Sequence, residues 1–549
     1  MTATAPTRAS ATAQTGGRVL TGTGTLARFV LRRDRIRIPV WVGALTLWLV
    51  AVAASFPGLY PTAAERQARA QLMANPTARA LSGPGYGLDD YTFGAMLANE
   101  TLGLVAVLVA LMSVLLVVRH TRAEEASGRA ELVRSGVVGR QASTTAAIAV
   151  VAAINLVLGA AVAVGLTSLG IDSIDWPGSL LLGASLAAVG LVFTGVGAVT
   201  AQLTVHPRAA SGTAGLLIGM AYALRAAGDT GDGTLAWLSP IGWAQATRVY
   251  VADRWWPLAL AVAASAALVA VAIRLSARRD LGAGLRVPRP GRAAASDALA
   301  TPIGLALWLQ RASLIGWAVA LFAFGLVYGT LTGDVQSFIE RSQTLQNAIG
   351  RIAGAPLIDA YLALVISLLA IVSATYVLLA ALRMRDEETA GRAEPLLAAA
   401  WSRPRWAASH LVIAMAGGAL VLLTATMGLG IGAAAVLHDA AVVPRLLASA
   451  LAYVPALWLV AGLAVALFGL VPRAAALVWV VVAYGLTIQV LGGLLGLPDW
   501  TYDLSPFAHI PAVPAQQVTF TPLVVLTALA AALVTVGLTA FRNRDLQSP

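Results

Sequence analysis

Residues 96–118 read Met96-Leu-Ala-Asn-Glu-Thr-Leu-Gly-Leu-Val-Ala-Val-Leu-Val-Ala-Leu-Met-Ser-Val-Leu-Leu-Val-Val118, an apolar run with one acidic residue near its start. A helix needs about 20 such residues to cross the hydrocarbon core of a bilayer. Comparable runs recur along the 549 residues, of which 58% are hydrophobic and 11% charged. This composition leaves too little polar surface to cover a soluble body of this size. The sequence therefore predicts an all-α membrane protein.

About twelve membrane-spanning helices are expected when proline, glycine and charged residues are used to mark the ends of the apolar runs. In the first half we place them at residues 39–59, 96–118, 142–168, 178–203, 211–227 and 257–275. In the second half we place them at residues 312–332, 359–382, 408–437, 446–471, 474–496 and 522–541. Arginines crowd the segment before the first helix and the segment between the halves. Loops rich in arginine usually lie on the cytoplasmic side of a membrane. We therefore expect a multi-pass plasma-membrane protein with both termini cytoplasmic.

A charged sequence occurs twice in the chain. Arg122-Ala-Glu-Glu-Ala-Ser-Gly-Arg-Ala-Glu131 matches Arg385-Asp-Glu-Glu-Thr-Ala-Gly-Arg-Ala-Glu394 at seven of ten positions, at a spacing of 263. Similar offsets align Leu238-Ser-Pro240 with Leu504-Ser-Pro506, and Arg279-Asp-Leu281 with Arg544-Asp-Leu546. The matches predict two parallel six-helix repeats, because an even number of helices gives both copies the same orientation.

The repeat also suggests how the chain is divided. Residues 1–25 are rich in Ala, Thr and Gly and are expected to form a disordered leader. The first six-helix half then covers residues 26–282, a cytoplasmic linker covers 283–299, and the second half covers 300–549. In each half a long outer loop, residues 60–95 and 333–358, carries an amphipathic helical pattern. We favour helices on the outer leaflet over a substrate gate for these loops.

Several chemistries are disfavoured by residue content. The chain has no cysteine, which excludes disulfides and thiolate sites. It also has no lysine, and the phosphate-binding loop of ATPases needs one, so any ATP must be hydrolysed by another chain. The five histidines have no metal-ligand spacing. We therefore expect no enzyme activity, metal or cofactor in this chain, and we attribute its net charge of +11 to membrane anchoring rather than to nucleic-acid binding.

The duplicated sequence E-E-x-x-G-R-x-E follows the second helix of each half, where a cytoplasmic loop is expected. We call residues 122–131 and 385–394 the first and second motif segments. Their spacing predicts i,i+4 pairs, Glu125 with Arg129 and Glu388 with Arg392. Such pairs stabilise a helix by only about 0.2–0.5 kcal/mol, too little to explain the duplication. A docking role is favoured over a merely solvated charged loop.

At these residues the chain resembles the membrane permeases of ABC-2-type exporters, especially fused actinobacterial multidrug and polyketide-antibiotic permeases of the tetronasin type. The resemblance implies a type V-like exporter fold in which each motif segment is a coupling helix bound by a separate ATPase. It assigns Glu124, Glu125, Gly128, Arg129 and Glu131 to one ATPase copy, and Glu387, Glu388, Gly391, Arg392 and Glu394 to the other. The two ATPase copies would bind ATP and Mg²⁺.

Few ionisable groups lie within the expected helices, and charge inside a membrane is costly and often marks function. Glu100 and Asp359, at the outer starts of the second and eighth helices, are candidates for attracting cationic drugs. The alternative is that they cap helix N-termini in water. Asn155, Gln202 and Gln489 are candidates for lining a substrate path, although hydrogen bonding between helices explains them equally well. The remaining lining would be apolar and would suit a hydrophobic, drug-like or lipid-like substrate.

Three functions compete on these observations. An ATP-driven exporter permease fits the duplicated motif and the resemblance. An ion-coupled 12-helix drug transporter needs protonatable residues at mid-membrane, and the expected helices contain almost none. A membrane enzyme needs a cluster of carboxylates, histidines or metal ligands, which the sequence does not show. We therefore expect an exporter permease, with the ion-coupled transporter as the alternative.

Overall fold

The computed structural model describes residues 19–279, 282, 284–285, 294–333, 357–398, 401–495 and 498–546. Over these residues the chain folds into helices and loops, without a strand. Contacts divide it into two compact units, Met1–Pro290 and Gly291–Pro549, and each is described by itself. The boundary falls inside the segment 283–299 that was expected to link the halves. The predicted all-α membrane architecture is confirmed.

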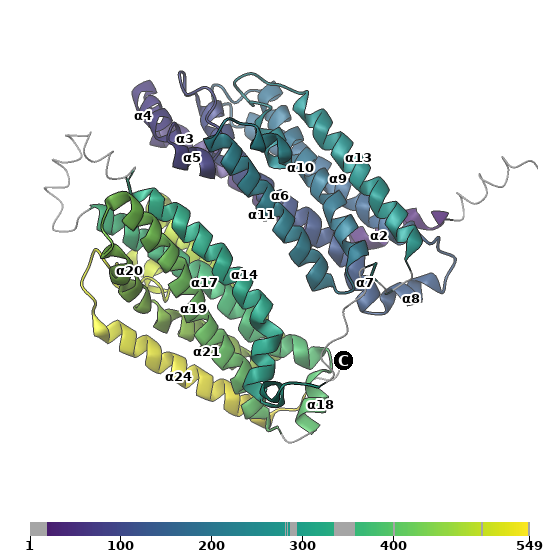
Figure 1. Ribbon diagram of the computed structural model, residues 1–549, viewed down its shortest axis with the longest axis vertical. Coiled ribbons are helices and arrows are strands. Elements are labelled where there is room, and N and C mark those ends of the chain that lie inside the picture. The colour runs from purple at the N-terminus through teal and green to yellow at the C-terminus, as the bar shows by residue number, and fades with distance from the viewer. Residues whose placement is uncertain are drawn as a thin grey trace, which may run out of the picture. The chain divides into compact units, whose positions relative to one another are not determined.

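Among the described residues of the first unit, the first helix is α2, which starts at Thr23, inside the stretch expected to be a leader. Its helices are α2 (Thr23–Arg33), α3 (Arg37–Leu59), α4 (Ala63–Met73), α5 (Pro76–Leu81), α6 (Phe93–His120), α7 (Arg122–Ala126), α8 (Arg129–Arg134), α9 (Ala142–Thr167), α10 (Trp176–Leu203), α11 (Pro207–Thr230), α12 (Pro240–Gln245) and α13 (Pro257–Arg278). The interior is formed mainly by α6, α9 and α10, and the short helices α7 and α8 lie at one end of the unit (Figure 1).

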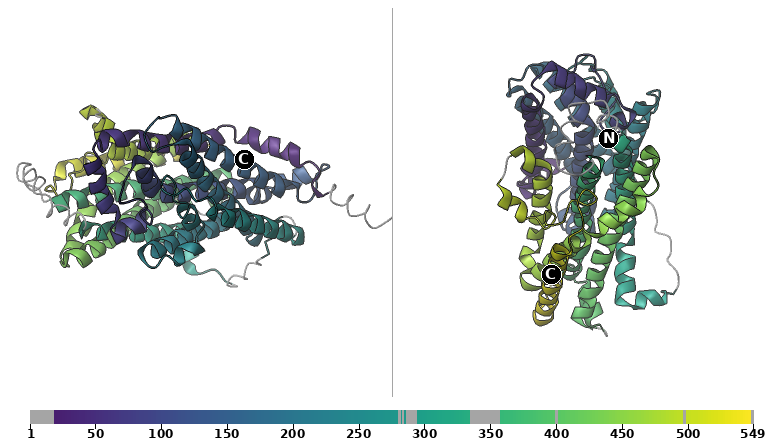
Figure 2. Two further views of the ribbon diagram at one scale, coloured as in Figure 1. Left: turned by 90° about the horizontal axis from the view of Figure 1, so that it is seen from above. Right: turned by 90° about the vertical axis from the view of Figure 1, so that its left-hand side faces the viewer.

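The second unit repeats this plan, with two of its interior helices longer than their counterparts in the first unit. Its described helices are α14 (Pro302–Thr330), α17 (Leu357–Thr389), α18 (Ala393–Ala398), α19 (Arg403–Leu437), α20 (Val442–Leu451), α21 (Val454–Leu470), α22 (Trp479–Leu495), α23 (Asp499–Asp503) and α24 (Phe520–Asn543). The right-hand view of Figure 2 shows the long green-to-yellow helices of this unit running roughly side by side. The amphipathic stretch expected within residues 333–358 lies almost wholly outside the described residues.

Eleven of the described helices or joined helix pairs are long and apolar enough to cross a membrane. Five belong to the first unit and six to the second. The expected span 211–227 forms α11, which is outside this set and carries Arg208, Arg225 and Asp229. It packs against α6 and α10 (Figure 1).

Small residues let the long helices approach each other closely. A Cβ atom added at Gly159 of α9 would lie 2.6 Å from the carbonyl oxygen of Gly183 on α10. In the second unit, a Cβ at Gly325 of α14 would collide with the carbonyl oxygen of Ala425 on α19. Within a bilayer, lipid tails are as apolar as leucine side chains, so burying apolar surface does not drive helices together. Small residues favour packing because they let the helix backbones approach closely. These contacts hold α9 against α10 in the first unit and α14 against α19 in the second.

Candidate functional site

Each motif segment contains a glycine with left-handed backbone. Gly128 has φ +75° and separates α7 from α8, and Gly391 has φ +68° between α17 and α18. Because the helix breaks at this glycine, the i,i+4 geometry is lost. The predicted pairs Glu125–Arg129 and Glu388–Arg392 are therefore wrong. The repeated spacing within the motif serves a bent segment rather than one helical turn.

Glu125 instead binds two buried arginines of the first unit. The Nη1 atom of Arg279, which directly follows α13, donates to Oε2 of Glu125 at 2.7 Å, and its Nη2 donates to Oε1 at 2.5 Å. Arg122 donates to the same carboxylate at 2.6 Å and also to the carbonyl oxygen of Val205 at 2.6 Å. The end of the last helix of this unit is thus bonded to the motif segment, which Figure 1 shows beside it.

Glu388 occupies the matching position in the second unit and is bound in the same way. Nη1 and Nη2 of Arg544, directly after α24, donate to its two carboxylate oxygens at 2.6 and 2.7 Å. The Arg544 guanidinium also lies over the rings of Phe468 and Phe541, 4.9 and 5.0 Å from their centroids. Such bidentate, charge-assisted pairs fix both distance and orientation.

A third residue, also an arginine, completes the arrangement in both units. Arg140, just before α9, donates to the carbonyl oxygen of Arg279 at 3.0 Å. Arg403, the first residue of α19, donates to the carbonyl oxygen of Arg544 at 2.6 Å. Each set joins the motif segment and the start of the following helix to the end of the last helix. We call these sets the first clamp, Glu125, Arg140 and Arg279, and the second clamp, Glu388, Arg403 and Arg544.

The first glutamate of the motif makes different contacts in the two units. Glu124 forms an ion pair with Arg33 at the end of α2. Glu387 pairs with Arg383 at 3.3 Å and with Nε of Arg392 at 2.6 Å. The hydrogen bond to Glu387 raises the pKa of the Arg392 guanidinium. The copies therefore share the clamp but differ in what holds their first glutamate.

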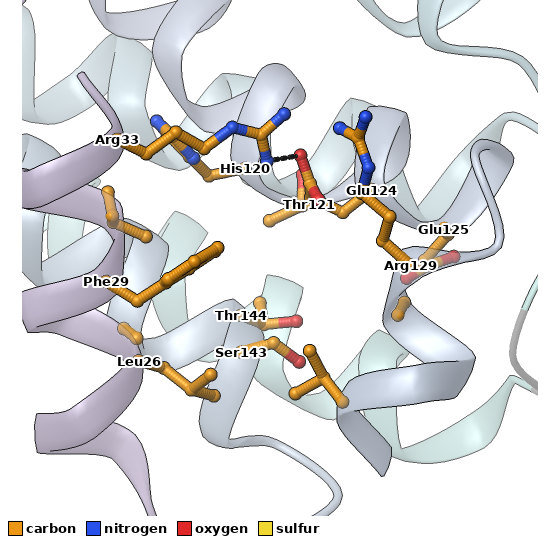
Figure 3. A pocket seen from close by; sticks show the side chains of 14 residues that line it. Leu26, Phe29, Arg33, His120, Thr121, Glu124, Glu125, Arg129, Ser143 and Thr144 are labelled. Atoms are coloured by element: carbon orange, nitrogen blue, oxygen red, sulfur yellow. Dashed lines mark hydrogen bonds and ion pairs between the residues drawn. The ribbon is translucent and has the colours of Figure 1, made fainter. Parts of the chain in front are cut away.

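The exposed side of the first motif segment borders a groove (Figure 3). Figure 3 shows Leu26 and Phe29 of α2 on one side and Glu124 and Arg129 on the other, with Ser143 and Thr144 of α9 at the base. The groove has about 620 Å³ of empty space, part of it open to solvent. One wall of the groove is therefore apolar, and its opposite rim is charged.

The outward-facing residues in and beside the motif segments are charged or apolar. In the first segment Arg129 and Glu131 are exposed, and Leu132 directly after it is 76% exposed. Val137, in the loop toward α9, is 91% exposed. In the second segment Glu394 is exposed and the Arg392 side chain is 54% exposed. Single exposed apolar side chains are common on protein surfaces. Leu132 and Val137 are candidates for contact with another molecule because they follow the duplicated charged motif.

Glu100 and Asp359 are both paired with arginines. Arg69 of α4 donates to both carboxylate oxygens of Glu100, at 3.0 and 2.9 Å. Arg445 of α20 pairs with Asp359 at 2.9 Å. Burial raises the pKa of Tyr91, which lies beside Glu100, and the Glu100 charge adds to that shift. In this structure neither acid presents an unpaired negative charge.

Asn155 and Gln202 lie in the first unit and are completely buried. The Asn155 amide donates to Oγ of Ser113 on α6 at 3.0 Å, and Oγ1 of Thr194 on α10 lies 3.4 Å from it. Asn155 therefore bonds three helices together. Gln202, at the end of α10, accepts a hydrogen bond from Nε of Arg279 at 2.5 Å. It thus belongs with the first clamp.

The comparisons with known proteins agree with this architecture. The family model described as the C-terminal domain of the multidrug efflux system permease Rv1217c matches residues 24–275 and 299–542. The multidrug efflux system permease protein Rv1217c of Mycobacterium tuberculosis (strain ATCC 25618 / H37Rv) is 41% identical over 543 residues, which cover 97% of this chain and 96% of that protein. The chain belongs to this family of multidrug efflux permeases.

Gln489 is the candidate that does border a cavity of the permease. Ser367 of α17 donates to its Oε1 at 3.2 Å. The cavity has about 1210 Å³ of empty space, partly open, and lies in the second unit between α17, α22 and the segment after α23. Besides Ser367 and Gln489, its polar lining residues are Tyr453 and Gln516. Gln489 is thus a predicted path residue that the structure sets against open space.

The clamp arginines were not predicted as site residues of the permease. Arg279 and Arg544 were visible in the sequence as a repeated Arg-Asp-Leu. Arg140 and Arg403 share the spacing of 263 found for the motif itself. A common offset among charged residues was therefore the available signal. Among the described residues no group of acids and histidines is arranged to hold a metal ion.

Proposed function

We propose that the permease is the membrane subunit of an ATP-driven exporter of apolar or amphipathic drugs. Two copies of a separate ABC ATPase bind ATP and Mg²⁺ and dock on the two motif segments. The permease lies in the plasma membrane with both termini in the cytoplasm, since its arginine-rich segments are then inside. This chain supplies the path, and the ATPase supplies the free energy of hydrolysis.

The observation that carries this proposal is that some side chains of the first motif segment are bound inside the unit while others face outward. Glu125 is turned inward and held by Arg122 and Arg279. Arg129 faces outward, and among the described residues it makes no hydrogen bond or ion pair. Leu132, three residues further along the chain, is also largely exposed. Covering a leucine side chain is worth about 1.5–3 kcal/mol, which a docked protein would gain.

Only some of the motif residues are therefore assigned to contact with the ATPase. At the first segment we assign Arg129, Glu131 and the adjoining Leu132 to docking, with Glu124 at the rim of the groove. In the second segment we assign Arg392 and Glu394. The glycines with left-handed backbone set the bend that separates these residues from the inward glutamates; they are Gly128 and Gly391.

The experiment is co-purification of the tagged permease with an ABC ATPase co-expressed from the same genomic locus. The variant Arg129→Ala/Leu132→Asp should lose most of the bound ATPase, while Arg278→Ala, an exposed arginine at the end of α13, should retain it. An unchanged amount of bound ATPase in the double variant would contradict the docking assignment.

The energy source separates this function from the ion-coupled alternative. Efflux of ethidium from cells that express the permease and the ATPase should stop when ATP is depleted and the proton gradient is maintained. Efflux that survives ATP depletion and stops when the gradient is dissipated would establish the alternative. A Walker-lysine variant of the ATPase serves as the matched control.

A further inference from the structure

The same three-residue clamp occurs in two units whose other contacts differ. In each unit the arginine after the last helix binds a motif glutamate through its side chain, and its carbonyl oxygen accepts a hydrogen bond from an arginine at the start of the third helix. The first glutamates of the two motifs are held by unrelated partners, Arg33 in one unit and Arg383 with Arg392 in the other. The clamp is therefore the feature that the duplicated sequences share in three dimensions.

We propose that Arg279 and Arg544 are positioning residues that make each motif segment and the last helix of its unit move as one piece. This inference rests on the proposed docking of an ATPase on the motif segments. A push on the motif segment is then passed directly to α13 or α24. Without the clamp, the bent segment would be held less firmly to that helix; in the first unit Arg122 would still donate to the carbonyl oxygen of Gly282, after α13, at 2.7 Å.

Burial and geometry support a mechanical role over a purely stabilising one. The side chains of Glu125 and Arg279 are 8% and 5% exposed, and those of Glu388 and Arg544 are 2% and 16% exposed. A buried ion pair is seldom more stabilising than apolar residues of similar volume, because both charges lose their hydration. It does restrict distance and direction far more than an apolar contact does. Its presence in both units indicates that the geometry is what matters.

The fourth expected helix of each unit also contacts its clamp. Gln202 at the end of α10 accepts a hydrogen bond from Arg279. Near the end of α21, Phe468 takes the corresponding place and lies under the Arg544 guanidinium. The clamp arginine is thus contacted by an amide through a hydrogen bond in the first unit, and by an aromatic ring through a cation–π interaction in the second. In both units the arginine after the last helix contacts residues from the ends of three other expected helices or their adjoining loops.

The absence of cysteine allows a direct distance measurement. Spin labels at Ala126→Cys and Ala277→Cys, both exposed positions, report on the motif segment and the end of α13. The permease–ATPase complex in nanodiscs is measured without nucleotide and with ATP, Mg²⁺ and vanadate. We expect one narrow distance that is the same in both states. In Arg279→Ala the distance should broaden and change with nucleotide, whereas Arg279→Lys should be intermediate and Arg278→Ala unchanged.

The functional readout is the amount of ethidium exported per ATP hydrolysed. Arg279→Ala/Arg544→Ala should keep the ATPase bound and hydrolysing ATP, but export should fall at least tenfold. Equal label distances in Arg279→Ala and the unaltered chain, or full export by the double variant, would overturn the clamp. Failure of the unaltered permease to retain an ATPase would overturn the proposed function and this inference together.

Discussion

Arg544 donates two hydrogen bonds to Glu388, and Arg279 donates two to Glu125, at positions related by the internal repeat. The second glutamate of the duplicated motif is therefore an internal contact of each unit. This explains its duplication better than a weak intrahelical pair does. The outward residues of the motif remain for docking.

Replacing Glu388 with alanine should destabilise the second unit. Arg544 would keep its charge in a largely enclosed site without a carboxylate partner, which typically costs about 3–5 kcal/mol. The thermal unfolding midpoint of the purified permease should fall clearly. Glu131→Ala, at an exposed position of the other motif segment, should leave the midpoint within error. An equal midpoint for both variants would contradict the role of the buried pair.

Gly128→Ala should weaken ATPase binding through the backbone alone. A Cβ atom at Gly128 meets nothing within 4 Å, so crowding is not the cause. The φ of +75° costs an L-residue roughly 1–2 kcal/mol, which favours a different bend between α7 and α8. Gly136→Ala is the control, since its Cβ makes only ordinary contact and its φ is not positive. Co-purification with the ATPase measures the effect, and a loss in both variants would argue against the bend.

Asp229 should make the first unit more stable in mild acid. Burial raises the pKa of its carboxyl to about 6, against the opposing effects of Arg225 and Arg79. The folded state thus binds this proton more tightly than the unfolded state, whose carboxyl titrates near its ordinary value. The stabilisation is greatest below about pH 4 and is lost as the pH rises to about 6.

Thermal unfolding between pH 4.5 and 7 tests this sign. The unaltered permease should lose stability across that range by an amount that Asp229→Asn does not show. Asp172→Asn, at an exposed position, should behave like the unaltered chain. A pH dependence that is identical in Asp229→Asn would place its origin elsewhere.

Asn155→Ala should lower stability without changing which drugs are exported. Its amide links α9 to Ser113 of α6 and Thr194 of α10, and such bonds within membrane helices are worth about 0.6–2 kcal/mol. Export of ethidium, scaled to the amount of folded permease, should match that of Leu156→Ala, a change at an exposed position of α9. A selective loss of export would return Asn155 to the substrate path.

Much of the fold could be predicted because membrane crossing depends on local apolar composition. The spans at 142–168 and 178–203 agree closely with α9 and α10. The span at 211–227 was harder, since α11 carries two charged residues that are buried by tertiary contacts. Arg225 donates to the carbonyl oxygens of Arg79 and Leu81, and it also donates to the carboxylate of Asp229. A hydropathy average counts each charged residue as polar and takes no account of the tertiary contacts that pair its charge.

The site was predicted in place but not in detail. The motif segments were found because duplication is visible in the sequence. The partners of Glu125 and Glu388 were not, since Arg279 and Arg544 lie 154 and 156 residues away along the chain. Helical spacing suggested the motif arginines instead, and the left-handed glycine within each motif removed that geometry. Backbone breaks and distant ion pairs are tertiary properties.

The most direct test of the central claim is photo-crosslinking in intact cells from a benzoylphenylalanine placed at Leu132. Leu216 of α11, another exposed apolar position, is the control site. We expect the ABC ATPase to be captured from position 132 and not from position 216. Efflux-competent cells in which position 132 captures no ATPase would contradict the claim that the motif segments are where the motor binds.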